Sequence, residues 1–222
     1  MMMITRDDGS FGLTRYHEEY LIPNGLVNDT EFMRDKMVQA VFKAIGIHDP
    51  GHTVSGAFTK MYMVEEARLA GNFSLMVPSL FDLMSVIFFK AGTLRTIQLH
   101  SRLNSDTYYF SFEYEGRYKR HPFYSNYQGE VGHADDQIYL FSLSGEFNEE
   151  EQVLSDMMVD YYANFMYTGN PNTFPPGEAP SSLPFWPKFD TNSEKYLIID
   201  ENTREASKYE DTWAVANRKR KL

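Results

Sequence analysis

Cysteine is absent from the 222 residues, and basic side chains are in the minority. Without cysteine no disulfide framework can form, so the redox compartment of the protein cannot be inferred from disulfide bridges. The 21 lysines and arginines face 31 acidic residues, which gives a formal net charge of −10. This charge disfavours nucleic acid or an anionic membrane surface as a partner, because both are negatively charged. We therefore expect a small molecule or a protein as the partner.

The sequence also lacks an uninterrupted apolar run of the length that spans a membrane. Its most apolar stretch, residues 73–89, contains Pro78 and Asp82 and is followed by Lys90. A spanning helix needs about 20 consecutive apolar residues, so we expect a buried helix here and no membrane span. The first residues show no basic region, apolar core or cleavage site of a signal peptide, so we expect any targeting signal either upstream of Met1 or not at all.

The apolar residues that are present predict strands that alternate with helices. Hydrophobic residues make up 42% of the chain and aromatic residues 15%, a composition that predicts a globular protein. The apolar run at residues 1–5 enters an Asp-Asp-Gly turn, which predicts a buried strand. Residues 107–114 predict a central strand and residues 196–199 an edge strand. This alternation indicates an α/β protein.

Helix signals occupy much of the remaining chain. Asn28 can cap a helix with Glu31 as the third residue of a capping box and Gly46 as the terminator. From Glu149 to Gly169, two adjacent apolar stripes predict a further amphipathic helix. The other expected helices cover residues 48–69, 78–99 and 203–216.

Two loops that follow strands carry titratable side chains. Sites in α/β sheets gather in the loops at the carboxyl ends of strands. The first loop is TRDDGSF at residues 5–11, and the second is GEVGHADDQIYLF at residues 129–141. Taken alone, Asp-Asp-Gly is an ordinary turn and a single loop histidine is usually solvated, so these residues leave a structural and a catalytic interpretation open.

Taken together, the segments resemble one known family. Residues 5–11 resemble the segment around the catalytic acid of type-B carboxylesterases and cholinesterases, and residues 129–141 resemble the catalytic-histidine loop of the same family. Residues 157–172 resemble its long helix with the Gly-Asn-Pro-Asn end, and residues 185–200 its Trp-Pro segment. Trp213 falls where the family has a terminal tryptophan. The chain is therefore identified as a member of this family, insect-esterase-like, over essentially its whole length.

The resemblance implies the C-terminal part of an α/β-hydrolase fold, with a mostly parallel central sheet flanked by helices. Residues 1–222 are then expected to be the C-terminal portion of a single carboxylesterase domain, without its nucleophile-bearing N-terminal portion. A strand that begins at the first residues, with no preceding cap or linker, points the same way, because its edge needs a partner from further chain. We expect an upstream part of the same domain.

The family's triad order along the chain is Ser, then Asp or Glu, then His. The resemblance makes His133 the general base and Asp8 the acid, because the family's carboxylate immediately precedes the glycine. Asp7 matches the non-catalytic neighbour. Most relatives carry Glu where this chain has the shorter Asp8. A carboxylate that accepts the imidazole Nδ1–H fixes the tautomer and leaves Nε2 to take a serine proton.

The residues after His133 match acidic positions of the family. We expect Asp135 and Asp136 to be structural and to accept hydrogen bonds from backbone donors in the loop. Residues Ile138 to Phe141 are expected to form a strand that packs the loop. No cofactor or metal is expected for this chemistry.

The serine of the triad is missing. Neither Gly-x-Ser-x-Gly nor a glycine-rich oxyanion loop occurs in the sequence. We expect a fragment of a serine esterase that acts on a small-molecule carboxylic ester and is inactive alone. The first alternative is a catalytically silent, neuroligin-like adhesion protein that keeps the family fold. The second is a free-standing small domain that binds an apolar ligand.

Two asparagines lie in glycosylation triplets. Asn28-Asp29-Thr30 and Asn72-Phe73-Ser74 match the acceptor pattern, which places such loops on the surface of a secreted protein. We therefore expect Asn28 and Asn72 as possible glycosylation sites and a secreted or extracellular location.

Overall fold

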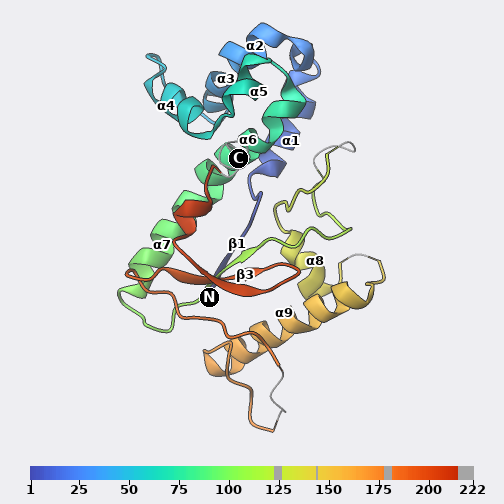
Figure 1. Cartoon of the computed structure of the whole chain (residues 1–222), viewed down its shortest axis with the longest axis vertical. Coiled ribbons are helices and arrows are strands. Elements are labelled where there is room, and N and C mark those ends of the chain that lie inside the picture. Colours follow the sequence, from blue (N-terminus) through green and yellow to red (C-terminus); the bar gives the residue numbers. More distant parts are fainter. Residues whose placement is uncertain (123–126, 144, 178–181, 215–222) are drawn as a thin grey trace. The chain divides into compact units, whose positions relative to one another are not determined.

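The computed structural model describes residues 1–122, 127–143, 145–177 and 182–214 (Figure 1). Within them, a four-stranded sheet has the order β1-β2-β3-β4. The β1–β2 and β2–β3 pairs are parallel, and the β3–β4 pair is antiparallel. The strands are β1 at Met2–Thr5, β2 at Tyr109–Phe112, β3 at Lys195–Ile199 and β4 at Arg204–Ser207. A mixed sheet with helices confirms the α/β class and the two strands predicted from residues 1–5 and 107–114.

The sheet is buried in an aromatic core because its middle strands are apolar on both faces. All four residues of β2 are buried, as are the last four of β3. Trp186 packs edge-on against Phe110 at 5.2 Å and against Tyr161 at 5.1 Å between ring centroids. Its indole N–H donates to the Tyr109 carbonyl over 3.0 Å, so the ring is satisfied and fixed to the central strand.

The end of the described chain differs from the prediction. The strand predicted at residues 196–199 is present, but β3 lies between two strands and is not an edge. The predicted helix at 203–216 is wrong where the structure describes it. A turn at Asp200, whose carboxylate accepts the Asn202 N–H over 2.8 Å, sends β4 back along β3, and the short 3-10 helix η4 follows at Tyr209–Thr212. Residues 215 and 216 lie outside the described residues.

Helices α8 and α9 lie between β2 and β3 in the chain. Helix α9, Glu149–Thr168, is confirmed, with a full capping box at Asn148 and a left-handed Gly169 as its end. Helix α8, Asp135–Phe141, replaces the strand predicted from Ile138 to Phe141. Its buried positions repeat at helical spacing, and its two aspartates occupy the first turn, where the helix dipole favours negative charge.

The chain divides into two compact units, one of residues 1–8 and 89–211 and one of residues 9–88 with the chain from Thr212 on. The first unit contains the sheet. The second is helical, and its core includes Leu13, Met76 and Leu80, which are fully buried. Its helices are α1 Ser10–Tyr16, the π-helix η1 His17–Leu21, η2 Leu26–Asn28, α2 Thr30–Asp35, α3 Met37–Ala44, α4 Thr53–Tyr62, α5 Glu65–Leu69 and α6 Phe73–Ser85.

The helix predicted from Asn28 starts one residue later and is broken. Asp29, not Asn28, is the N-cap of α2, because its carboxylate accepts the Phe32 N–H over 2.9 Å. Lys36 leaves the helical conformation, with φ −124° and ψ −18°, and separates α2 from α3. The stop at Gly46, which has φ +80°, is confirmed. Helices α4 and α5 confirm the helical character predicted for residues 48–69.

The long helix predicted at 78–99 begins earlier. Asn72 caps it by accepting the Leu75 N–H over 3.1 Å, and Pro78 lies inside α6. The π-helix η3, Val86–Lys90, and α7, Ala91–Ser101, continue it. By length and composition alone Phe73–Ser101 is apolar enough to cross a membrane, but 67% of its most apolar window is buried, as in a core helix.

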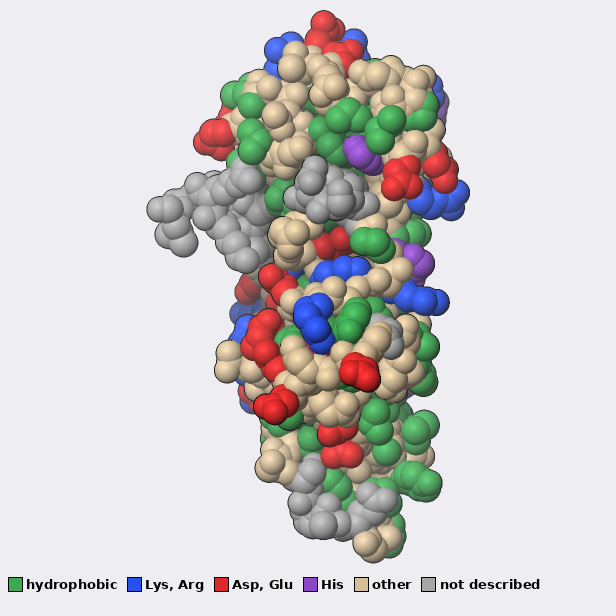
Figure 2. Space-filling view, turned by 90° about the vertical axis from the view of Figure 1, so that its right-hand side faces the viewer, with side chains coloured by type: hydrophobic (Ala, Val, Ile, Leu, Met, Phe, Trp, Pro, Cys, Tyr) green, Lys and Arg blue, Asp and Glu red, His purple; other side chains and the backbone are tan. Residues whose placement is uncertain are grey.

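On the face shown in Figure 2, acidic and basic side chains of the described residues are interspersed. The visible lysines and arginines mostly neighbour aspartates and glutamates there.

Candidate active site

The two loops singled out in the sequence meet at one end of the sheet. Strands β1 and β2 are parallel neighbours, so the segments that follow them leave the same edge. The pairing extends past β1 as a bridge between Asp7 and Gly132. Beyond it, Oδ1 of Asp8 lies 2.6 Å from Nδ1 of His133, although the two residues are 125 positions apart. The expected proximity of these side chains is present.

The environment of the pair favours a charged imidazole. The Asp8 side chain is 7% exposed and that of His133 is 41% exposed. The hydrogen bond with Asp8 raises the pKa of His133 above its ordinary value, against the effect of partial burial, and the negative charges of Asp136 and Asp135 act in the same direction. With Nδ1–H donating to a carboxylate, Nε2 is the basic nitrogen of the neutral ring.

Two rings flank the His133 imidazole. Phe89, from η3, stacks on it at 5.0 Å between centroids and 21° between planes. The imidazole of His121 lies nearly parallel to it, at 6.4 Å and 18°. Stacking restricts rotation of the ring about the bond that carries it, so the Nδ1 contact with Asp8 is supported from the side. Phe89 was not predicted from the sequence, because one aromatic residue in an apolar helix carries no distinguishing signal.

The acidic residues after His133 differ from each other. Asp135 is structural as predicted, since its carboxylate accepts the N–H of Arg120 over 2.7 Å and that of Gly132 over 2.8 Å. Asp136 is also buried. Hydrogen bonds from the main-chain N–H groups of Asp136 and Gln137 favour its charged form, as predicted, but its Oδ1 has no hydrogen-bond partner among the described residues. Burial, followed by the charge of Asp8, raises the pKa of Asp136 to about 7. Asp136 therefore belongs to the electrostatic surroundings of the pair.

The two residues that precede Asp8 also contact the loop that carries His133. Asp7 accepts the Val131 N–H over 2.9 Å with Oδ2 and donates its own N–H to the Val131 carbonyl over 2.8 Å. Its neighbour Arg6 reaches the same loop. Asp7 was expected only as the non-catalytic neighbour of the acid. Arg6 was not predicted, although a charged Arg-Asp-Asp run at the end of a buried strand is a visible signal.

The two sequon asparagines belong to the helical unit. Asn28 and Asn72 are both exposed and line the same small surface pocket, between the end of η2 and the start of α6. Their environment contains no titratable side chain among the residues that line this pocket.

Comparison with known proteins identifies the family. The sequence profile of the carboxylesterase family matches residues 1–215. The chain belongs to the carboxylesterase family. Its fold is accordingly part of an α/β-hydrolase fold, as the resemblance implied.

Individual carboxylesterases align with parts of this chain. Liver carboxylesterase of Sus scrofa is 32% identical over 128 residues, which cover 57% of this chain and 21% of that protein. Carboxylesterase 5A of Mus musculus is 31% identical over 144 residues, 60% of this chain and 23% of that protein. Acylcarnitine hydrolase of Rattus norvegicus is 28% identical over 142 residues, 62% of this chain and 21% of that protein. The alignments thus span about a fifth of the length of these relatives.

Proposed function

We propose that this carboxylesterase chain supplies the acid and the base of a serine ester hydrolase, with Asp8 and His133 in these roles. The observation that carries the proposal is the 2.6 Å contact between Asp8 Oδ1 and His133 Nδ1, in loops that match the family. The nucleophilic serine and the oxyanion donors belong, in this proposal, to an upstream part of the same domain. The substrate is a small-molecule carboxylic ester.

The chemistry assigns each group one task. Nε2 of His133 removes the proton of the serine hydroxyl as it attacks the ester carbonyl, and later returns it to the leaving alcohol. Asp8 holds the correct tautomer and stabilises the imidazolium that forms in between. Water then cleaves the acyl-enzyme by the same proton transfers. No metal or cofactor takes part in these steps.

The shorter acid does not prevent this geometry. Most relatives implied by the resemblance use Glu where this chain has Asp8, and the contact here is nevertheless 2.6 Å. The low exposure of the Asp8 side chain keeps water from competing for the imidazole N–H. We therefore propose that Asp8 is a working acid.

The proposal is tested on the protein extended upstream until it contains a Gly-x-Ser-x-Gly elbow. A short-chain aryl ester should be turned over, and a serine-directed organophosphate should label the protein once. His133→Ala should lower kcat by about three to six powers of ten. Asp8→Asn should lower kcat by up to about four powers of ten, because it favours the wrong tautomer.

A matched histidine variant controls for nonspecific damage. His48→Ala removes an exposed loop imidazole of the helical unit and should leave kcat unchanged. Asp8→Glu should retain measurable turnover if the site tolerates both acids. An extended protein with an intact elbow that hydrolyses equally fast without His133 contradicts the assignment of the base. An extended protein without an elbow supports the neuroligin-like alternative.

We also propose N-glycosylation of a secreted protein at Asn28 and Asn72. Both side chains are exposed, and a glycan on Nδ2 of Asn72 leaves Oδ1 able to accept the Leu75 N–H that caps α6. Expression in a secretory host should give a mass shift that a peptide N-glycosidase removes, and Asn28→Gln and Asn72→Gln should each abolish one part of it. A secreted protein with no such shift contradicts this proposal.

A further inference from the structure

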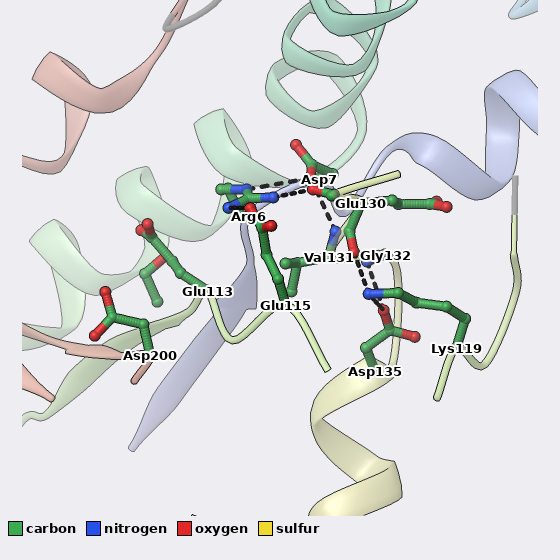
Figure 3. A network of polar contacts seen from close by, with 12 residues as sticks. Arg6, Asp7, Glu113, Glu115, Lys119, Glu130, Val131, Gly132, Asp135 and Asp200 are labelled. Carbon is green, nitrogen blue, oxygen red and sulfur yellow. Dashed lines mark hydrogen bonds and ion pairs between the residues drawn. The ribbon is translucent and has the colours of Figure 1, made fainter. Parts of the chain in front are cut away.

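The four residues before His133 are each held through a main-chain group by a charged side chain. Carbonyl oxygens are bound by cations at Gly129 and Glu130, and N–H groups are bound by carboxylates at Val131 and Gly132. The side chains that hold them are, in the same order, those of Arg6, Lys119, Asp7 and Asp135, which we call the charged clamp (Figure 3).

Half of the charged clamp comes from the strand that carries the acid. Arg6 and Asp7 directly precede Asp8, and the main chain of Arg6 is fixed to β2 by its N–H, which donates to the Phe112 carbonyl over 2.9 Å. The guanidinium of Arg6 then spans three groups. Nε donates to Asp7 Oδ2 over 3.2 Å, Nη1 to Glu115 Oε1 over 2.7 Å, and Nη2 to the Gly129 carbonyl.

This arrangement links the two loops outside the Asp8–His133 contact itself. Asp7 Oδ2 receives both Arg6 Nε–H and Val131 N–H, so the two holds share one oxygen. The Arg6–Asp7 pair is partly buried, because the two side chains are 27% and 13% exposed. The other partner of Arg6, Glu115, is 48% exposed. Bonds with this much burial resist competition from water better than a surface ion pair does.

The other half of the charged clamp belongs to the histidine segment. Lys119 Nζ donates to the Glu130 carbonyl and lies 3.7 Å from Asp135 Oδ2. Asp135 in turn accepts the N–H of Gly132 and of Arg120. These contacts shape the histidine loop internally. Arg6 and Asp7 instead attach this loop to the turn at residues 6–9 that carries Asp8, which we call the acid turn.

We infer that Arg6 is a positioning residue, whose hydrogen bonds to Asp7 and Gly129 set the distance between Asp8 and the catalytic histidine. The inference rests on the proposed function of Asp8 and His133 as acid and base. Arg6 touches neither the imidazole nor, in this account, the ester. It acts by holding the main chain of the histidine loop against the end of β1.

The test uses this chain alone and measures the His133 pKa by NMR of the imidazole. Arg6→Met keeps the aliphatic stem and removes the three hydrogen-bonding contacts. If the Asp8–His133 bond loosens as inferred, the His133 pKa falls towards its ordinary value, because that bond is the main cause of its elevation. Loss of a nearby positive charge by itself acts in the opposite direction and raises the pKa, so the sign separates positioning from simple charge.

Two further variants complete the test. Arg15 pairs with Glu19, and its side chain is 71% exposed. Arg15→Met removes this exposed cation and should leave the His133 pKa unchanged. Arg6→Lys keeps the charge but not the forked geometry, so it should restore only part of the loss. If Arg6→Met does not fold, Arg6→Lys carries the same measurement, with a smaller fall.

An Arg6→Met chain with native thermal unfolding and an unchanged or raised His133 pKa overturns the inference. The result is independent of turnover, because no upstream segment or ester is needed. In the extended protein, the same variant should lower kcat about tenfold and leave KM nearly unchanged. A protein that shows the pKa fall but no hydrolysis in any form refutes the proposed function and leaves the positioning role of Arg6 standing.

Discussion

The acid turn and the histidine loop contribute one side chain each to the same pair, but the chain holds them in different ways. Asp8 follows β1 after two residues, and Gly9 behind it donates its N–H to Ser85 Oγ over 2.9 Å. The histidine loop runs between β2 and α8. Its described part contains a single β-bridge, between Gly132 and Asp7. A short turn takes its geometry from the strand, whereas a long loop depends on individual polar contacts.

The largest expected effect is in the acid turn, at Gly9. A Cβ there would lie 2.3 Å from the main-chain carbon of Met84 and 2.3 Å from the nitrogen of Ser85. Because these are backbone atoms of a buried helix, they cannot move aside, and Gly9→Ala should lower the free energy of unfolding by about 3 kcal/mol or more. Gly56→Ala, at a helix position with open space around it, should instead raise it by about 0.5–1 kcal/mol. Equal effects in chemical denaturation would contradict the close approach at Gly9.

The histidine loop should be most sensitive at Asp135. Asp135→Ala leaves the buried N–H of Gly132 and the partly buried N–H of Arg120 without their acceptor, which should cost about 3 kcal/mol. Asp190 is the matched control, since it also accepts two backbone N–H bonds, from Asn192 and Ser193, but in an exposed turn. Asp190→Ala should cost about 1 kcal/mol, because water replaces the carboxylate. Similar losses at the two sites would show that loop burial does not matter.

The same contrast explains which features of the site could be predicted from the sequence. The acid turn was predictable because an apolar run, an acidic pair and a glycine are local signals. The pairing of Asp8 with His133 came from the family resemblance, since no local pattern joins residues 125 positions apart. The hydrogen bonds of the charged clamp from Arg6 and Lys119 to loop carbonyls were not predictable, because the main-chain carbonyl is the same in every residue.

Errors in the fold arose where local propensity competes with tertiary pairing. Residues 138–141 are apolar and aromatic, which favours a strand, yet the aspartates before them start a helix. Residues 203–207 contain helix formers, but the hydrogen-bonding edge of β3 captures them as β4. Such pairing energy exceeds intrinsic propensity, which differs by less than about 1 kcal/mol per residue.

The buried Asp136 should make stability depend on pH. Burial and the charge of Asp8 raise its pKa from 3.8 to about 7, so the folded state keeps a proton that the unfolded state releases in that window. The free energy of unfolding should therefore fall as the pH rises from about 4 to 7. Asp136→Asn should remove this loss and stabilise the chain by roughly 4 kcal/mol above that window, with no gain below it.

An exposed carboxylate gives the reference for this effect. Asp156→Asn, on the exposed surface of α9, is the control variant. The comparison is made by chemical denaturation across the window. An Asp136→Asn curve that runs parallel to that of the parent protein at every pH would rule out the raised pKa.

The smallest expected effect is at Ala134, directly after His133. Ala134 has φ +65° and ψ +16°, a left-handed conformation that costs a residue with a Cβ about 1 kcal/mol. Ala134→Gly removes this strain but increases the freedom of the unfolded chain, so stability should rise by less than about 1 kcal/mol. Gly169→Ala, at φ +75° with open space around it, is the converse and should cost about 1 kcal/mol. A clear loss of stability in Ala134→Gly would mean that its methyl group packs in the loop.

The most direct measurement of the central claim is the titration of His133 by NMR in this chain and in its Asp8→Asn variant. We expect a parent pKa above the ordinary value of about 6.5, since Asp8 stabilises the imidazolium, and a clear fall in the variant. The parent should also gain stability from this bond at low pH and lose it as the pH rises through the raised pKa. A His133 that titrates at its ordinary value, and does so equally in both proteins, would contradict the pairing of acid and base on which the proposed esterase function depends.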